Sequence, residues 1–206
     1  MLKIWGRISS INVQKAMWAV GELDLEHVRH DAGGVYGVVD TPDYANLNPN
    51  RLVPTIDDDG FVLWESNAIV RYLAARYGEG GLWPTDVRVR ADADRWMDWM
   101  ETKLVPSIRP VFWQLIRTAP EDRDADAIAA GVADLARQFE ILDAALGGRD
   151  FVAGDRLTIG DIPVGCAAYR YFGLNIERPA LPNVERWYDR LTERPAFRVH
   201  VMVPIT

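Results

Sequence analysis

The chain has 206 residues, with 30 acidic and 23 basic side chains and a formal net charge of −7. Its 49% of apolar residues excludes a disordered chain, and its acidic balance lacks the basic surface that nucleic-acid backbones require. One cysteine, Cys166, excludes an internal disulfide, and no apolar run reaches the roughly 18 residues of a membrane span or forms a signal peptide, so we expect a soluble cytoplasmic protein.

The first part of the chain alternates short apolar runs with helical patterns. In chain order we predict a strand at 2–5, a helix through 13–23, a weaker strand at 26–30, a short helix opened by Thr41-Pro42, strands at 53–56 and 61–64 around an acidic turn at 57–60, and a helix at 65–77. This order predicts an α/β unit with a mixed sheet.

The rest of the chain predicts helices only. After a glycine-rich break at 78–81, helical patterns cover residues 88–106, 122–146, 158–172 and 183–193, the last stopped by Pro195. We therefore expect an α/β domain at 1–78, a linker at 79–87 and an all-α domain at 88–206.

Two short segments carry candidate chemistry. The first is Ser9-Ser10-Ile11-Asn12, directly before the first long helix. Its default interpretation is an N-cap, because serine and asparagine oxygens accept the free N–H groups of a helix start. The alternative is an anion site, because the partial positive charge of a helix N-terminus favours an anion such as a thiolate.

The second segment is the hairpin from Val53-Pro54 to Glu65-Ser66. Proline there is ordinarily a strand boundary, but a cis bond would turn the preceding backbone groups outward to pair with an extended peptide. Glu65-Ser66 is by default a helix cap. Alternatively, Ser66 holds a ligand carboxylate and Glu65 accepts from an ammonium. Together these elements predict a site for one zwitterionic peptide.

The other polar patterns favour structural roles. Thr158 and Asp161 resemble a capping box at the start of a buried helix, and Cys166 on that helix is interpreted as an inert core residue. The three histidines have no paired spacing, so we expect no metal.

Taken together, these motifs resemble the glutathione transferase superfamily over essentially the whole chain, in its serine-type, bacterial cytosolic form. The residues that carry the resemblance are, in order, Ser10-x-Asn12-Val13, Asn48-Pro49, Val53-Pro54, Glu65-Ser66-Asn67-Ala68-Ile69 and Leu157-Thr158-Ile159-Gly160-Asp161. The resemblance implies a thioredoxin-like N-terminal domain joined to an all-α C-terminal domain.

The resemblance also implies catalytic roles at the first helix. Ser10 resembles the hydroxyl that donates a hydrogen bond to the glutathione sulfur, and Asn12 resembles a helix-start asparagine near that sulfur. Because Ser9 precedes Ser10, the choice of hydroxyl stays open, with Ser10 favoured by its offset from Asn12-Val13.

The glutathione site implied by the resemblance lies in the hairpin. Val53 would pair with the cysteinyl part of glutathione, with Pro54 in the cis form, and Glu65 and Ser66 would hold its γ-glutamyl end. Arg51 replaces a glycine of the family pattern and is a candidate cation for the glycyl carboxylate.

The helical half would supply the second substrate site, for which Arg109, Phe112 and Trp113 are candidates beside plain core packing. The predicted activity is conjugation of glutathione, the co-substrate, to hydrophobic electrophiles. The alternatives are a glutathione-dependent peroxidase or disulfide reductase, and a non-catalytic ligand-binding protein of the same fold. The resemblance further implies a homodimer formed through helices 65–77 and 88–100.

Overall fold

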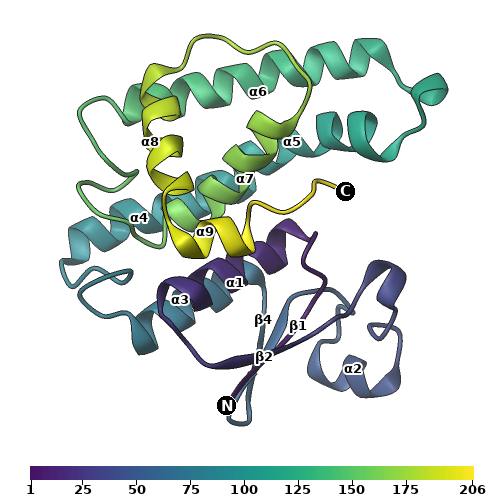
Figure 1. The fold of residues 1–206 in the computed structure, drawn as a ribbon, viewed down its shortest axis with the longest axis vertical. Coiled ribbons are helices and arrows are strands. Elements are labelled where there is room, and N and C mark those ends of the chain that lie inside the picture. The colour runs from purple at the N-terminus through teal and green to yellow at the C-terminus, as the bar shows by residue number, and fades with distance from the viewer.

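A four-stranded sheet lies at one end of the computed structural model, which describes all of residues 1–206, and helices alone build the other end (Figure 1). The elements of the sheet end are β1 (Leu2–Trp5), α1 (Ile11–Glu22), β2 (His27–His30), α2 (Pro42–Leu47), β3 (Thr55–Asp58), β4 (Phe61–Trp64) and α3 (Ser66–Tyr77). The strand order is β2-β1-β3-β4, with β2 parallel to β1 and the other two pairs antiparallel. The predicted α/β unit with a mixed, thioredoxin-like sheet is confirmed.

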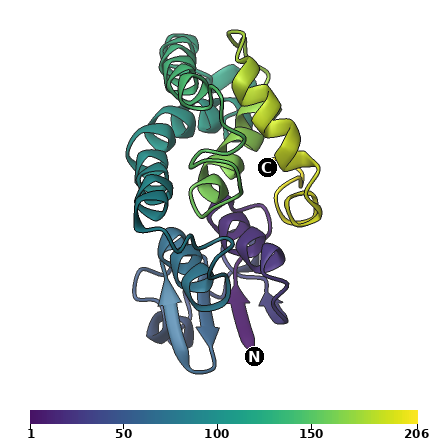
Figure 2. The same cartoon turned by 90° about the vertical axis from the view of Figure 1, so that its left-hand side faces the viewer.

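Helices α1 and α3 lie between the sheet and the helical part, as Figure 2 shows from the side. The apolar residues predicted for the first helix, among them Val13, Ala16, Met17 and Val20, are buried against the sheet. The opposite side of α1, with Trp18 and Ala19, belongs to the larger core of the helical part. Helix α1 therefore joins two hydrophobic cores.

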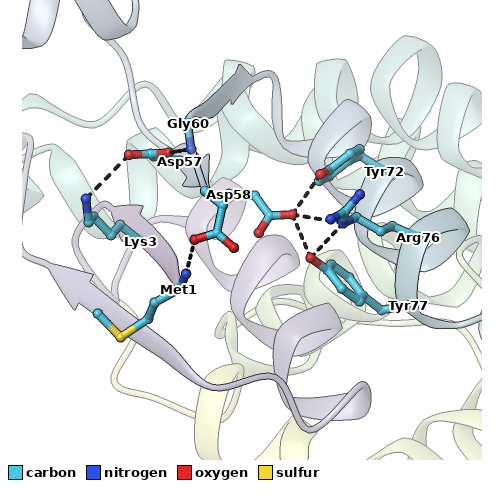
Figure 3. Close-up of polar contacts among 9 residues, drawn as sticks. Met1, Lys3, Asp57, Asp58, Gly60, Tyr72, Arg76 and Tyr77 are labelled. Carbon is cyan, nitrogen blue, oxygen red and sulfur yellow. Dashed lines mark hydrogen bonds and ion pairs between the residues drawn. The ribbon is translucent and has the colours of Figure 1, made fainter.

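The third strand lies two residues later than predicted. Asp57 and Asp58 are strand residues, and only Asp59 and Gly60 lie at the tip of the hairpin. The physical reason is that Asp58 pairs with Leu2 of β1 and has partners for its buried carboxylate. Figure 3 shows these partners, which all come from α3. The hydroxyls of Tyr72 and Tyr77 each lie 2.7 Å from Oδ2 of Asp58, and the guanidinium of Arg76 lies 3.4 Å from it.

Replacing Asp58 with alanine should reduce the free energy of unfolding by about 2 kcal/mol, because two tyrosine hydroxyls lose a charged acceptor. Urea denaturation followed by circular dichroism measures this change. Asp59→Asn is the matched control, since Asp59 is exposed at the turn, where its contact with the N-terminal amine of Met1 contributes little, and asparagine tolerates its positive φ of 50°. An equal shift of the urea midpoint in both variants would contradict a specific role for Asp58.

The helical part begins with one long, continuous helical segment. It comprises α4 (Val87–Trp99), a π-helical turn at Met100–Leu104, α5 (Val105–Phe112) and a second π-helical turn at Trp113–Arg117. The predicted helix end near Pro106 is wrong. Pro106 is the second residue of α5, where a missing N–H costs little, and the wider preceding turn, in which the Val105 N–H donates to the Met100 carbonyl, accommodates it.

Four further helices complete the fold: α6 (Ala125–Ala145), α7 (Asp161–Gly173), α8 (Pro182–Thr192) and α9 (Pro195–His200). Helix α9 was not predicted, because Pro195 was interpreted as a stop signal and instead occupies the first position of a new helix. The all-α character of this part is confirmed. None of the helices is both long and apolar enough to cross a membrane.

Besides the shared core, ion pairs connect α1 to the helical part, and Arg71 of α3 pairs with Asp94 and Asp98 of α4. Arg194 donates to both carboxylate oxygens of Glu22 on α1, at 2.8 and 2.5 Å. The fully buried Lys15, also on α1, contacts Glu101 at 2.5 Å. These contacts fix α1, and the segment before it, relative to the helical part.

Candidate functional site

A cleft of about 560 Å³ lies where the segment before α1 meets the long helical segment. From the α/β part it is lined by Arg7, Ser9, Ser10, Ile11, Asn12, Gly33, Gly34, Val39, Arg51, Leu52 and Val53. From the helical part it is lined by Glu101, Val105, Ile108, Arg109, Phe112, Trp113, Arg117 and Arg170. A cleft of this size holds a small organic ligand.

Most of the predicted site residues meet in this cleft. Ser9, Ser10 and Asn12 lie in one wall with Arg51 and Val53. The opposite wall contains the three residues predicted for the second substrate, Arg109, Phe112 and Trp113. Pro54, Glu65 and Ser66 are not part of the lining.

The hairpin nevertheless brings these three residues to the same sheet edge. Thr55 and Trp64 form the last pair of β3 and β4 at this end, so Pro54 and Glu65, the next residue of each chain segment, are neighbours. The Val53–Pro54 bond is cis, as predicted. Glu65 has a φ of 71°, which is unusual for a residue with a side chain and is typical of strained functional positions.

Ser10 occupies the N-cap position of α1, but its hydroxyl does not cap the helix. Its carbonyl accepts from the N–H of Gln14 at 2.9 Å, and no side chain caps the helix start. The Gln14 side chain in turn donates to the carbonyl of Ile8 at 3.2 Å. The backbone therefore fixes this segment while the Ser10 hydroxyl and the helix N-terminus stay free for a ligand in the cleft.

Arg51 adopts the left-handed conformation, with a φ of 54°, at the position where the family pattern has glycine. Glycine reaches this region without steric cost, which explains the family preference. The Arg51 guanidinium donates to the carbonyl of Asp40 at 3.1 Å and lies in the cleft wall.

Two glycines of the segment after β2, Gly33 and Gly34, also line the cleft. A Cβ on Gly33, whose φ is 78°, would lie 3.0 Å from Nη1 of Arg7. Gly33 and Gly34 thus leave room for the Arg7 guanidinium beside the cleft.

Sequence reasoning missed the main electrostatic feature of the site. Five arginines line the cleft: Arg7, Arg51, Arg109, Arg117 and Arg170. None of them has a side-chain carboxylate within 4.0 Å, and the one acidic residue of the lining, Glu101, is paired with Lys15. The cleft is therefore strongly cationic in a chain whose net charge is −7.

Arg170 connects the two walls. From α7 it donates to the carbonyl of Ser9 at 3.1 Å, and its guanidinium lies 4.3 Å from the ring centre of Phe112. Burial, together with the nearby positive charges of Arg117 and Arg7, lowers the pKa of Arg170 to about 10. The sequence signal for this role was the position of Arg170, a charged residue near the end of the largely apolar helix predicted at 158–172.

Cys166, on the same helix, is fully buried, and burial raises its pKa to about 12, as expected for an inert thiol. No group of three or more His, Cys, Asp or Glu side chains is arranged to hold a metal ion.

Comparison with known proteins gives matches along nearly the whole chain. The family model "Glutathione S-transferase, N-terminal domain" matches residues 9–76, and "Glutathione S-transferase, C-terminal domain" matches residues 97–195. Glutathione S-transferase GstB of Escherichia coli (strain K12) is 41% identical over 208 residues, covering 100% of both chains.

Solved structures agree with these matches. The crystal structure of the theta class glutathione S-transferase from Xanthomonas axonopodis pv. citri with glutathione bound has a TM-score of 0.95 and 44% identity, covering 100% of this chain and 99% of that one. The apo form of the same protein has a TM-score of 0.88 and 39% identity, covering 100% and 98%.

Proposed function

The chain belongs to the glutathione transferase superfamily, and from this premise we propose that it conjugates the glutathione thiolate to hydrophobic electrophiles in the cleft between its two parts. The observation that carries the proposal is the free hydroxyl of Ser10 beside the uncapped N-terminus of α1 in the cleft wall.

Ser10 activates the thiol by hydrogen bonding. A thiol with a pKa of about 8.5 is only about 3% ionised at pH 7, and lowering the pKa by about two units requires ~2.7 kcal/mol. A hydrogen bond to a charged group contributes about 1.5–3 kcal/mol and a helix N-terminus about 0.3–1. Ser10, Asn12 and the start of α1 are therefore sufficient. The serine donates to the sulfur and is not itself the nucleophile, and Ser9 is the competing donor.

The sheet edge beside the thiolate holds the rest of glutathione. The backbone of Val53, before the cis Pro54, pairs with the cysteinyl residue. Ser66 and the start of α3 bind the γ-glutamyl carboxylate, and Glu65 accepts from its ammonium. Arg51 supplies the cation for the glycyl carboxylate.

The electrophile binds against the helical wall. Phe112 contributes a buried ring and Trp113 an exposed one, 56% accessible, while Arg109 lies between solvent and cleft. The sulfur attacks the electrophilic carbon, a C–S bond forms, and the leaving group departs with the electron pair of the bond that breaks. For an acceptor with an activated double bond, the carbon next to the new bond takes up a proton instead.

Calorimetric titration of glutathione should give measurable binding. Glu65→Gln should raise the dissociation constant for glutathione by about tenfold or more, because the ammonium of the γ-glutamyl residue loses its charged acceptor. Glu79→Gln is the matched control, since Glu79 is an exposed acid outside the cleft. Absence of both heat and thermal stabilisation at millimolar glutathione would overturn the proposal.

Membership of the superfamily also suggests how the chain is divided into domains and how two copies assemble. We propose an N-terminal glutathione-binding domain at 1–78, a linker at 79–87, a helical domain at 88–206, and a cytoplasmic homodimer formed through α3 and α4. The large exposed side chains of Tyr77 and Val87, at neighbouring ends of these helices, support this dimer surface.

A further inference from the structure

The cationic charge of the cleft exceeds what glutathione requires. We propose that the electrophile of this enzyme is an amphipathic organic anion, whose apolar body carries a carboxylate or sulfonate group. This inference rests on the function proposed above and names the substrate class of the same site.

The charged groups of glutathione have partners outside the helical wall. Its γ-glutamyl end is held by Glu65 and Ser66 and its glycyl carboxylate by Arg51. Arg7, beside Gly33 and Gly34, adds a second cation on the same wall. These groups balance the tripeptide, so the three arginines of the helical wall have no glutathione carboxylate left to bind.

The helical wall places two arginines beside two aromatic rings. Residues 109, 112, 113 and 117 recur at helical spacing in one continuous segment, so they share one face, and all four line the cleft. Arg109 makes no side-chain hydrogen bond or ion pair, and Arg117 has no side-chain carboxylate partner but donates to the terminal main-chain oxygen of Thr206, at 2.6 Å. Two guanidinium groups thus flank aromatic rings in the same wall. This combination fits a ligand with an apolar body and an anionic group.

The positive charges of this wall favour a bound anion. Arg117 and Arg170 both lie over the ring of Phe112, at 5.9 and 4.3 Å from its centre. Two cations beside the same ring repel each other, and a bound anion relieves this repulsion. Arg71 and Arg194, which lie outside the cleft, are by contrast paired with carboxylates.

Because Arg170 already donates to Ser9 and covers Phe112, Arg109 and Arg117 are the groups that bind the anion. Their planar guanidinium groups suit a carboxylate or sulfonate, which accepts two parallel hydrogen bonds. The negative group stays outside the reacting bond and serves for binding and orientation.

A matched pair of aryl chlorides tests the proposal: 4-chloro-3-nitrobenzoate and its neutral carboxamide. In both, the glutathione sulfur attacks the carbon that carries chlorine, the C–S bond forms, and chloride leaves with the electrons of the C–Cl bond. After division by the uncatalysed rate constant, kcat/KM should be at least about tenfold higher for the benzoate. This preference should shrink at high salt.

The double variant Arg109→Gln, Arg117→Gln should reduce the benzoate-to-carboxamide ratio by about tenfold or more. The single variants give the same test if the double variant does not fold. Arg88→Gln is the matched control, because Arg88 is exposed, lies outside the cleft and makes no side-chain contact through hydrogen bonds or ion pairs; it should leave both rates unchanged.

The outcomes separate the two proposals. Conjugation of the carboxamide with no preference for the benzoate, or a preference that survives the double variant, overturns the anionic acceptor and leaves the transferase function in place. If glutathione binds but neither chloride reacts faster than without enzyme, the proposed conjugation fails and the inference fails with it.

Discussion

Replacing Ser10 with alanine should lower kcat/KM at pH 6.5 by about 10- to 100-fold, because the glutathione thiolate loses its hydrogen-bond donor. The bond contributes about 1.5–3 kcal/mol, equivalent to about one to two units in the pKa of the bound thiol. The structure gives this hydroxyl no other task, since it caps no N–H group of α1.

The pH dependence of the loss identifies its cause. Above the new pKa the thiol ionises without help, so the difference between wild type and Ser10→Ala should shrink as the pH rises from 6.5 to 9. An ultraviolet titration of the thiolate in the binary complex measures the same shift directly. A loss independent of pH would instead indicate that the substitution disturbs binding or folding.

Two further variants separate the neighbouring hydroxyls. Ser10→Thr keeps a hydroxyl and should recover much of the lost activity. Ser9→Ala is the matched control, since Ser9 also lines the cleft and is held through its carbonyl by Arg170, a bond that the substitution leaves intact. A larger effect of Ser9→Ala than of Ser10→Ala would assign the role to Ser9.

The parts of this site that follow from local sequence rules were predictable. A serine before a helix, a proline entering a strand and an acidic residue before the next helix are recognisable by their neighbours alone. The hairpin then fixes where Pro54 and Glu65 lie, because antiparallel pairing makes Thr55 and Trp64 neighbours.

The cationic cleft was not predictable in the same way. Its arginines come from four separate segments, and only the tertiary fold, in which α7 packs against both α1 and α5, brings them together. The net charge even pointed away from it, since carboxylates elsewhere in the chain outnumber the cations. Composition averages over a surface, whereas a ligand meets only the local field.

The hydrogen bonds of Asp161 were likewise predictable from the sequence only where they are local. Its predicted capping bond is present, with the N–H of Thr158 2.9 Å from Oδ2. Tertiary packing adds two donors from distant residues, the N–H of Val152 and the indole of Trp187, each 3.0 Å from Oδ1. The carboxylate is fully buried and connects the loop before α7 to α8.

Replacing Asp161 with alanine should therefore reduce the free energy of unfolding by about 3–5 kcal/mol, because several buried donors lose their acceptor. Urea denaturation measures this loss. Asp155→Ala is the matched control, since the Asp155 side chain is 88% exposed and should leave the midpoint unchanged. A loss below about 1 kcal/mol in Asp161→Ala would mean that water replaces the carboxylate.

The same carboxyl group also predicts a pH dependence of stability. Burial raises the pKa of Asp161 from 3.8 to about 6, against the donated hydrogen bonds, which lower it. Between these values the folded protein holds a proton that the unfolded chain releases, so the contribution of Asp161 is fully present below pH ~4 and is lost as the pH rises through ~6. The shift of about two pKa units corresponds to ~3 kcal/mol. Because Asp161→Asn cannot titrate, the stability of wild type relative to this variant should decrease over that range. An increase with pH would show that the hydrogen bonds, and not burial, control the pKa of Asp161.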